Sequence, residues 1–74
     1  MNKIDFKKSV YELTEEFPEL IEILYQLGFN PVKNDALRRT VGRWITIPQA
    51  CKNHGKDINE LILILKEKGY EIKE

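Results

Sequence analysis

Apolar residues recur at helical spacing in two similar segments of the chain, residues 19–29 and residues 60–70. In the first segment Leu20, Ile23, Leu24 and Leu27 share one helical face, and in the second Leu61, Ile62 and Leu65 share one with the preceding Ile58. A glycine (Gly28 or Gly69) followed by an aromatic residue closes each pattern. A glycine after the last turn can adopt the left-handed conformation that ends a helix. The pattern therefore predicts two apolar helices of similar design, the first over about residues 18–27.

A shorter predicted helix precedes each of these two helices, and both short helices open with the same kind of cap. Ser9 is followed three residues later by Glu12, and Thr46 is followed three residues later by Gln49. In such a capping box the hydroxyl accepts a hydrogen bond from a first-turn amide, and the longer side chain reaches back. The order of elements therefore predicts two helical hairpins.

A further helix is expected between the hairpins, from a cap at Asn34 or Asp35 to about Gly42. Its apolar residues are expected to continue one face, and its three arginines are expected to point toward water. The apolar positions are Leu37, Val41, Trp44 and Ile45, and the arginines are Arg38, Arg39 and Arg43.

Apolar and polar residues alternate at both ends of the chain, over residues 4–6 and residues 70–72. These stubs either pair as a short ribbon or lie as ordered coil against the helices, since isolated two-stranded ribbons are weak. The predicted fold class is all-α, a compact bundle of about five short helices built as two similar hairpins. We expect one domain over residues 1–74, with or without the terminal strand pair.

Length and composition argue against an enzyme. With 74 residues, 42% apolar and 32% charged, the chain fits a small ordered soluble domain. A core of this size supplies about 3–5 kcal/mol of net stability, which leaves little room for a deep catalytic pocket. No phosphate loop, acid–base pair or nucleophile–base arrangement is visible. We expect no catalytic activity and no cofactor.

The sequence shows no feature that directs it to or through a membrane. No apolar run approaches the roughly 20 residues of a membrane span, and the first eight residues lack the apolar stretch of a secretion signal. The single cysteine excludes an internal disulfide framework. We therefore expect a cytoplasmic protein that does not bind membranes.

Charge is balanced overall but unevenly distributed along the chain. Residues 9–32 contain five glutamates and no lysine or arginine, whereas residues 33–56 contain six cations and one aspartate. The isoelectric point near 6.6 argues against nucleic-acid binding, because basic readers usually exceed about 9.

The arginine cluster is the strongest candidate for a binding site. Arg38, Arg39 and Arg43 lie within six positions, and Trp44 beside them offers a stacking surface. Guanidinium groups recognise carboxylate or phosphate in a two-pronged geometry. The expected partner is another protein or an acidic group, and the chain itself is expected to be a monomer or a weak homodimer. The alternative is that these arginines pair internally with the glutamate-rich face of the first two helices.

Cys51 and His54 carry the second functional alternative, a redox-linked accessory protein acting through the thiol. A reactive cysteine needs an exposed, electropositive site, whereas Cys51 falls on the inner face of its predicted helix. As a Cys-x-x-His pair the two residues supply at most two ligands, and a structural zinc takes four. We therefore interpret Cys51 as a packed residue. His54 is expected on the same inner face, as a helix-end residue before Gly55.

Short motifs occur in a fixed order along nearly the whole chain. They are KSVYEL at 8–13, FPEL at 17–20, LGF at 27–29, TVGR at 40–43, TIP at 46–48, HGKD at 54–57 and LKEKGY at 65–70. This order resembles a small all-helical family catalogued as a domain of unknown function. Its cysteine-bearing branch is called the hybrid-cluster-protein-associated redox disulfide domain. The chain resembles the cysteine-poor branch, found alone or N-terminal to hemerythrin-like and PAS sensor domains. The resemblance implies a bundle of about five helices.

The chain departs from the redox branch at one place. That branch carries a cysteine pair shortly after the glycine that matches Gly28, whereas residues 29–34 of this chain contain no thiol. The disulfide function therefore does not transfer, and the resemblance assigns no catalytic residue. The favoured interpretation is a non-catalytic binding or regulatory module that uses the arginine cluster.

Overall fold

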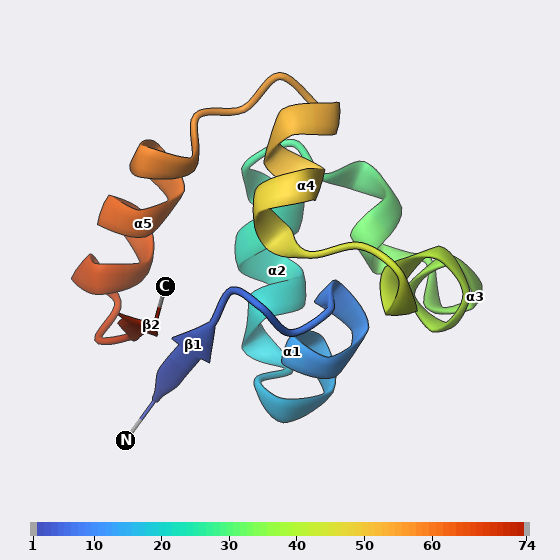
Figure 1. Cartoon of the computed structure of the whole chain (residues 1–74), viewed down its shortest axis with the longest axis horizontal. Helices are drawn as coiled ribbons and strands as arrows, with labels where there is room; N and C mark the ends of the chain where they lie inside the picture. The colour runs from blue at the N-terminus through green and yellow to red at the C-terminus, as the bar shows by residue number, and fades with distance from the viewer. Residues whose placement is uncertain (1, 74) are drawn as a thin grey trace.

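Two helical hairpins form the framework of the computed structural model, which describes residues 2–73 (Figure 1). The first hairpin consists of α1 (Val10–Glu16) and α2 (Glu19–Gln26), and the second consists of α4 (Ile47–Asn53) and α5 (Ile58–Glu67). The segment between them contains the 3₁₀ turn η1 (Asn30–Lys33), α3 (Asp35–Arg39) and the 3₁₀ turn η2 (Val41–Arg43). The predicted all-α bundle of two hairpins is confirmed.

Both predicted capping boxes are present at the starts of the hairpins. The Ser9 Oγ accepts from the Glu12 amide at 3.1 Å, and the Glu12 carboxylate accepts from the Ser9 amide at 3.1 Å. Thr46 and Gln49 make the same pair of bonds, at 3.4 and 2.9 Å. An antiparallel bridge joins the two capping residues Ser9 and Thr46 directly. The two hairpins therefore start side by side.

The second helix of each hairpin ends at a glycine in the left-handed conformation, as predicted. Gly28 has φ = 104° and Gly69 has φ = 95°. Residues other than glycine rarely adopt this backbone conformation. In both cases the amide after the glycine donates to the carbonyl of a leucine, Leu24 or Leu65, at 3.0 Å. This bond closes the helix end in the manner of a Schellman motif.

Of the two alternatives for the terminal segments, pairing as a short ribbon is the one observed. Strand β1 (Lys3–Asp5) pairs with β2 (Glu71–Lys73), and the pairing is parallel, with Ile4 opposite Ile72. Ile4 is fully buried, so the ribbon is held by the core as well as by its own hydrogen bonds.

The core combines side chains from both hairpins, from η1 and from the first strand. The predicted inner positions of α2 and α5 are buried or half-buried, which confirms their helical registers. The buried apolar residues are Ile4, Phe6, Val10, Leu13, Phe17, Leu20, Leu24, Phe29, Val32, Ile47, Cys51, Leu61, Leu65 and Tyr70. Among residues 2–73, no helix is long and apolar enough to cross a membrane.

The predicted helix from residue 34 to residue 42 is interrupted. It begins at the Asn34 cap, whose side chain accepts from the Leu37 amide at 3.1 Å, but α3 ends at Arg39. Thr40 leaves helical geometry (φ −104°, ψ −82°), and its hydroxyl donates to the Ala36 carbonyl at 2.8 Å. Such bonding of a threonine hydroxyl to the preceding turn competes with regular helix, and η2 continues the chain in a different register.

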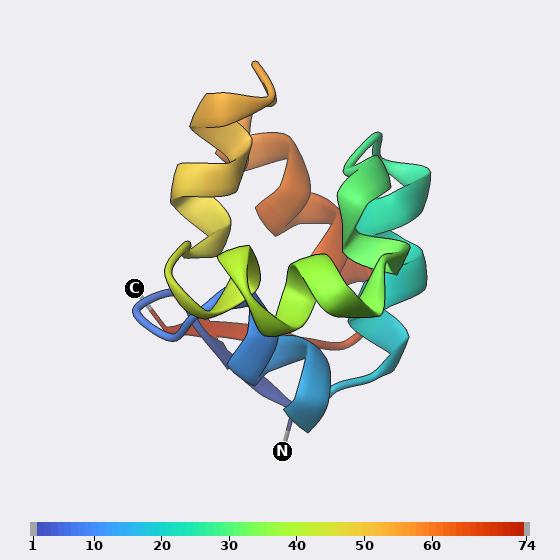
Figure 2. The same cartoon turned by 90° about the vertical axis from the view of Figure 1, so that its right-hand side faces the viewer.

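This interruption overturns the predicted orientation of the segment. Arg38 is buried, although it was expected to point toward water. Leu37, Val41 and Trp44 are exposed, although they were expected to continue an apolar face, and only Ile45 packs partly against the core. In Figure 2, where this side faces the viewer, α3 and η2 cross in front of the molecule between α1 and α4.

Candidate functional site

The α3–η2 segment displays a cluster of apolar side chains on the protein surface. Leu37 is 41% exposed, Val41 56% and Trp44 86%. Arg39 and Arg43 are also exposed and lie on the same segment. We call these five residues the Trp44 face. Contiguous exposed apolar residues with a polar rim are typical of interaction sites.

Arg43 is held in place by its neighbours. Its Nε donates to the carbonyl of Arg39 at 2.7 Å, and its guanidinium lies 4.4 Å from the centre of the Tyr11 ring. A guanidinium over an aromatic ring gains a cation–π attraction. The sequence prediction missed the role of Tyr11, which does not belong to the inner face of α1. The only sequence signal for this role was the position of Tyr11 on α1, outside the stripe of predicted inner residues.

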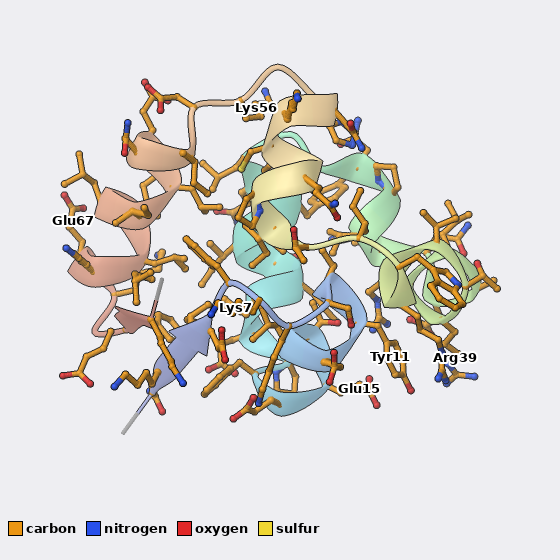
Figure 3. The ribbon with its side chains drawn as sticks, viewed as in Figure 1. Lys7, Tyr11, Glu15, Arg39, Lys56 and Glu67 are labelled. Carbon is orange, nitrogen blue, oxygen red and sulfur yellow. The ribbon has the colours of Figure 1, made fainter. Side chains whose placement is uncertain are left out.

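The charges of Arg39 and Arg43 are not neutralised by nearby carboxylates. Within residues 2–73, neither arginine has a carboxylate at ion-pair distance. Figure 3 shows the side chains of Arg39 and Tyr11 on the side of the molecule formed by α3 and α1. These two guanidinium groups are therefore available to an external acceptor.

Arg38 has a different role from the other two arginines. Its side chain is only 10% exposed, its Nη2 pairs with the Asp35 carboxylate, and its Nη1 lies 3.8 Å from the Glu15 carboxylate. Internal pairing with a glutamate of the first hairpin was the predicted alternative, and it is confirmed for Arg38. Arg38 therefore belongs to the packed structure rather than to the exposed face.

Two other glutamates of the first hairpin pair with lysines rather than with arginines. Glu16 lies 3.2 Å from Lys8, and Glu22 lies 3.2 Å from Lys33. Lys33 also lies 4.0 Å from the centre of the Tyr25 ring. Such exposed pairs contribute little stability, and within residues 2–73 neither glutamate lies at ion-pair distance from Arg39 or Arg43.

Cys51 occupies the core, as predicted. It is 1% exposed, and burial, with a smaller contribution from Asp57, raises the pKa of its thiol. A thiol reacts as the thiolate, so both burial and the direction of this shift oppose a nucleophilic or redox role.

His54 lies at the C-terminal end of α4, as predicted, but it is exposed rather than on the inner face. Its ring packs edge-on against Phe29, with 5.2 Å between the ring centres. In the part of the chain that the structure describes, no group of three or more His, Cys, Asp or Glu side chains is placed to hold a metal. Among residues 2–73, no further side chains join Cys51 and His54 to form a metal site.

Known proteins are similar to this chain in sequence and in fold. A family described as "Domain of unknown function (DUF1858)" matches residues 4–62. The crystal structure of the conserved domain protein from Streptococcus pneumoniae TIGR4 is 37% identical and superimposes with a TM-score of 0.93. The match covers 99% of this chain and 92% of that chain. No curated protein is similar enough to count as a relative.

Proposed function

We propose that this chain, which belongs to the DUF1858 family of domains of unknown function, is a non-catalytic protein-interaction module that binds acidic partners through the Trp44 face. The observation that carries the proposal is the exposure of Trp44, which leaves 86% of this large side chain in water. Burying a tryptophan against a partner gains more free energy than burying most other side chains.

The composition of the face supports a protein partner. Tryptophan and arginine are the residues enriched at energetic hot spots of protein interfaces. Leu37 and Val41 are further exposed apolar residues of the same segment, and Arg39 and Arg43 supply its exposed positive charge. A partner segment with an apolar anchor and flanking carboxylates complements this arrangement.

The arginines give the interaction a specific chemistry. A guanidinium donates two parallel hydrogen bonds to one carboxylate, which a lysine ammonium does not. The attraction between exposed charges is screened by salt, with a Debye length of about 10 Å at 0.1 M. Binding through this face should therefore weaken as the salt concentration rises.

We also propose that the chain belongs on the cysteine-poor side of a family related to the hybrid-cluster-protein-associated redox disulfide domain. The absence of a thiol from residues 29–34 and the burial of Cys51 support a binding role over a redox role. A reduced, buried thiol also suits the cytoplasm, where we propose that the protein acts.

The test compares variants of the immobilised chain in the capture of proteins from an extract of its own cells. Trp44→Ala and the double variant Arg39→Glu/Arg43→Glu should lose the captured partner while keeping their helical content. Leu63→Ala is the matched apolar control, because Leu63 is 62% exposed on α5. Lys66→Glu/Lys68→Glu makes the same charge change at two exposed positions near the end of α5.

The two roles of the arginines predict opposite results for the double variant. Loss of capture with an unchanged melting temperature supports the binding role. Unchanged capture with a clear fall in melting temperature would show that Arg39 and Arg43 serve the fold, and it would remove the assignment of this face.

Thiol labelling separates the binding module from the redox alternative. Cys51 should react with a thiol reagent only at the rate of unfolding, because its sulfur is buried. Rapid labelling of the folded protein would revive the redox alternative.

A further inference from the structure

A pocket of about 320 Å³ lies between the first hairpin, the α3–η2 segment and α4. Its wall is mainly apolar and includes residues of α2, η1 and α4. Leu37 and Val41 belong to this wall and are also exposed, so the pocket opens to the surface at the α3–η2 segment. An apolar cavity of about 150 Å³ holds one benzene molecule. A pocket of about 320 Å³ therefore has room for the two fused rings of an indole.

Trp44 presents such an indole on the surface of the same chain. It is 86% exposed, and among residues 2–73 it is not part of the pocket wall. Gly42 and Ile45, which flank Trp44 closely in the sequence, both line the pocket. Trp44 therefore lies at the edge of a pocket that its own side chain does not fill.

Two copies related by a two-fold axis bring the same surface patch together. A residue at the edge of the pocket in one copy then meets the edge of the pocket in the other. Each copy supplies one exposed indole and one apolar pocket, so a single symmetric contact can cover both tryptophans. An indole needs no charged group in the pocket, because most of its surface is apolar.

The charges beside this segment are those that two identical surfaces need for mutual attraction. Arg39 and Arg43 are exposed, and within residues 2–73 neither has a carboxylate at ion-pair distance. The Asp35 and Glu15 side chains at Arg38 are themselves 70% and 59% exposed. A carboxylate accepts several hydrogen bonds, so these two can also accept from the free arginines of a second copy.

We propose that two copies of this chain associate about a two-fold axis, with the Trp44 indole of each copy inserted into the apolar pocket of the other. The proposal does not rest on the binding of an acidic partner, which would compete with the second copy for Trp44. Two inserted aromatic side chains bury about 300–500 Å² together, whereas stable complexes bury about 1,200–2,000 Å². The association is therefore weak and reversible.

The first experiment measures sedimentation of the purified chain from micromolar to millimolar concentration, and the fluorescence emission of the same samples. Trp44 is the only tryptophan of the chain, so the emission reports on this side chain. The mass should rise from 8.7 kDa toward twice that value, and the emission should move to shorter wavelength as the indole leaves water. Trp44→Ala should weaken the association by at least about tenfold. Leu63→Ala, at an exposed apolar position of α5, should not change it.

Mixing two variants tests the exchange of indoles directly. Ala50→Leu fills the pocket and keeps Trp44, whereas Trp44→Ala keeps the pocket and lacks the indole. Each variant alone should remain a monomer at millimolar concentration. Together they should form a mixed pair, weaker than the parent pair because it contains one of the two indole–pocket contacts. The emission of Ala50→Leu should move to shorter wavelength when Trp44→Ala is added.

Circular dichroism establishes that each variant keeps its fold. Asn59→Leu, at an exposed position of α5, is the matched control for Ala50→Leu and should associate like the parent chain. If Ala50→Leu does not fold, the concentration series of the parent chain and of Trp44→Ala decides alone.

Three results would overturn the proposal. A parent chain that remains a monomer up to millimolar concentration would exclude the second copy as the occupant of the pocket. Association without a shift in the emission of Trp44 would place the contact elsewhere on the molecule. Folded Ala50→Leu and Trp44→Ala that do not associate on mixing would exclude the exchange. Because no other protein is present, these results are independent of the acidic partner of the proposed function.

Discussion

The two hairpins and the α3–η2 segment differ in which side chains they bury and which they expose. In the hairpins the apolar stripes are buried, as at Leu24 and Leu65, and charged residues face water. In the α3–η2 segment the charged Arg38 is buried and the apolar Trp44 is exposed. Packing and local propensity explain the hairpins, whereas they do not explain an exposed tryptophan. Such local disagreement is expected where a chain serves binding rather than folding.

The largest expected effect concerns the two leucines that precede the helix-ending glycines. Leu24→Ala and Leu65→Ala should each lower the free energy of unfolding by about 2–5 kcal/mol, since both side chains are buried in the shared core. Leu37→Ala, on the exposed side, should cost within about 0.5 kcal/mol. Urea denaturation followed by circular dichroism measures all three. A loss below about 1 kcal/mol at both core leucines would contradict the two-hairpin core.

The hairpins could be predicted because their signals are local. The cap at Ser9 and the glycine at position 28 act within a few residues, and both are found as expected. The α3–η2 segment was mispredicted because its outcome depends on contacts distant in sequence. The buried Arg38 lies 3.8 Å from the Glu15 carboxylate of α1, and the Arg43 guanidinium lies over the Tyr11 ring of α1. Helical periodicity carries no information on such contacts.

The terminal ribbon illustrates the same limit. The alternation of residues indicated two stubs that can pair, but not whether they do. The pairing depends on the burial of Ile4 in the core. The parallel direction depends on the position at which the chain leaves α5 to form β2. For the candidate site, the exposure of Arg39 and Arg43 was predicted correctly from the sequence. Trp44 was expected to continue an apolar face, whereas it is exposed.

Replacing one glycine by alanine in each region should change the stability in opposite directions. Gly28 has φ = 104°, so Gly28→Ala should cost about 1–2 kcal/mol. Gly42 in η2 lacks a positive φ, and an added Cβ would meet Tyr11 and Arg38 atoms at ordinary distances of 3.6–3.7 Å. Gly42→Ala should therefore stabilise the chain by about 0.4–1 kcal/mol through the unfolded state. Thermal denaturation of both variants is the measurement, and a shared sign would contradict the assigned backbone conformations.

A pH-dependent effect should be confined to the hairpin side of the molecule. The Tyr70 hydroxyl donates to the Glu19 carboxylate at 2.5 Å, and burial, then this bond, raises the pKa of Tyr70 to about 12. A raised pKa means that the folded state keeps its proton while the unfolded state loses it. The contribution of Tyr70 to stability is therefore complete below pH 10 and falls between about pH 10 and 12.

Comparison with Tyr70→Phe isolates this effect from the other groups that titrate in alkali. The difference in the free energy of unfolding between parent and variant should shrink as the pH rises through this window. On the acid side, the hydrogen bond from Tyr70 lowers the pKa of Glu19 below its usual 4.5. The stabilisation by ionised Glu19 is therefore lost as the pH falls below that value. A constant difference across both windows would show that the bond does not form in solution.

The smallest expected change in stability is at the exposed tryptophan that follows η2. Trp44→Ala removes a side chain that is 86% exposed, so it should change the free energy of unfolding by less than about 0.5 kcal/mol. Phe29→Ala is the contrasting variant, because Phe29 is buried beside the pocket and its truncation should cost about 3–5 kcal/mol. Denaturation of both variants, with tryptophan-independent detection by circular dichroism, checks the pair. A loss above about 1 kcal/mol for Trp44→Ala would mean that the indole packs on the domain in solution. The Trp44 face would then be part of the fold, and the contrast between the hairpins and the α3–η2 segment would no longer identify a binding surface.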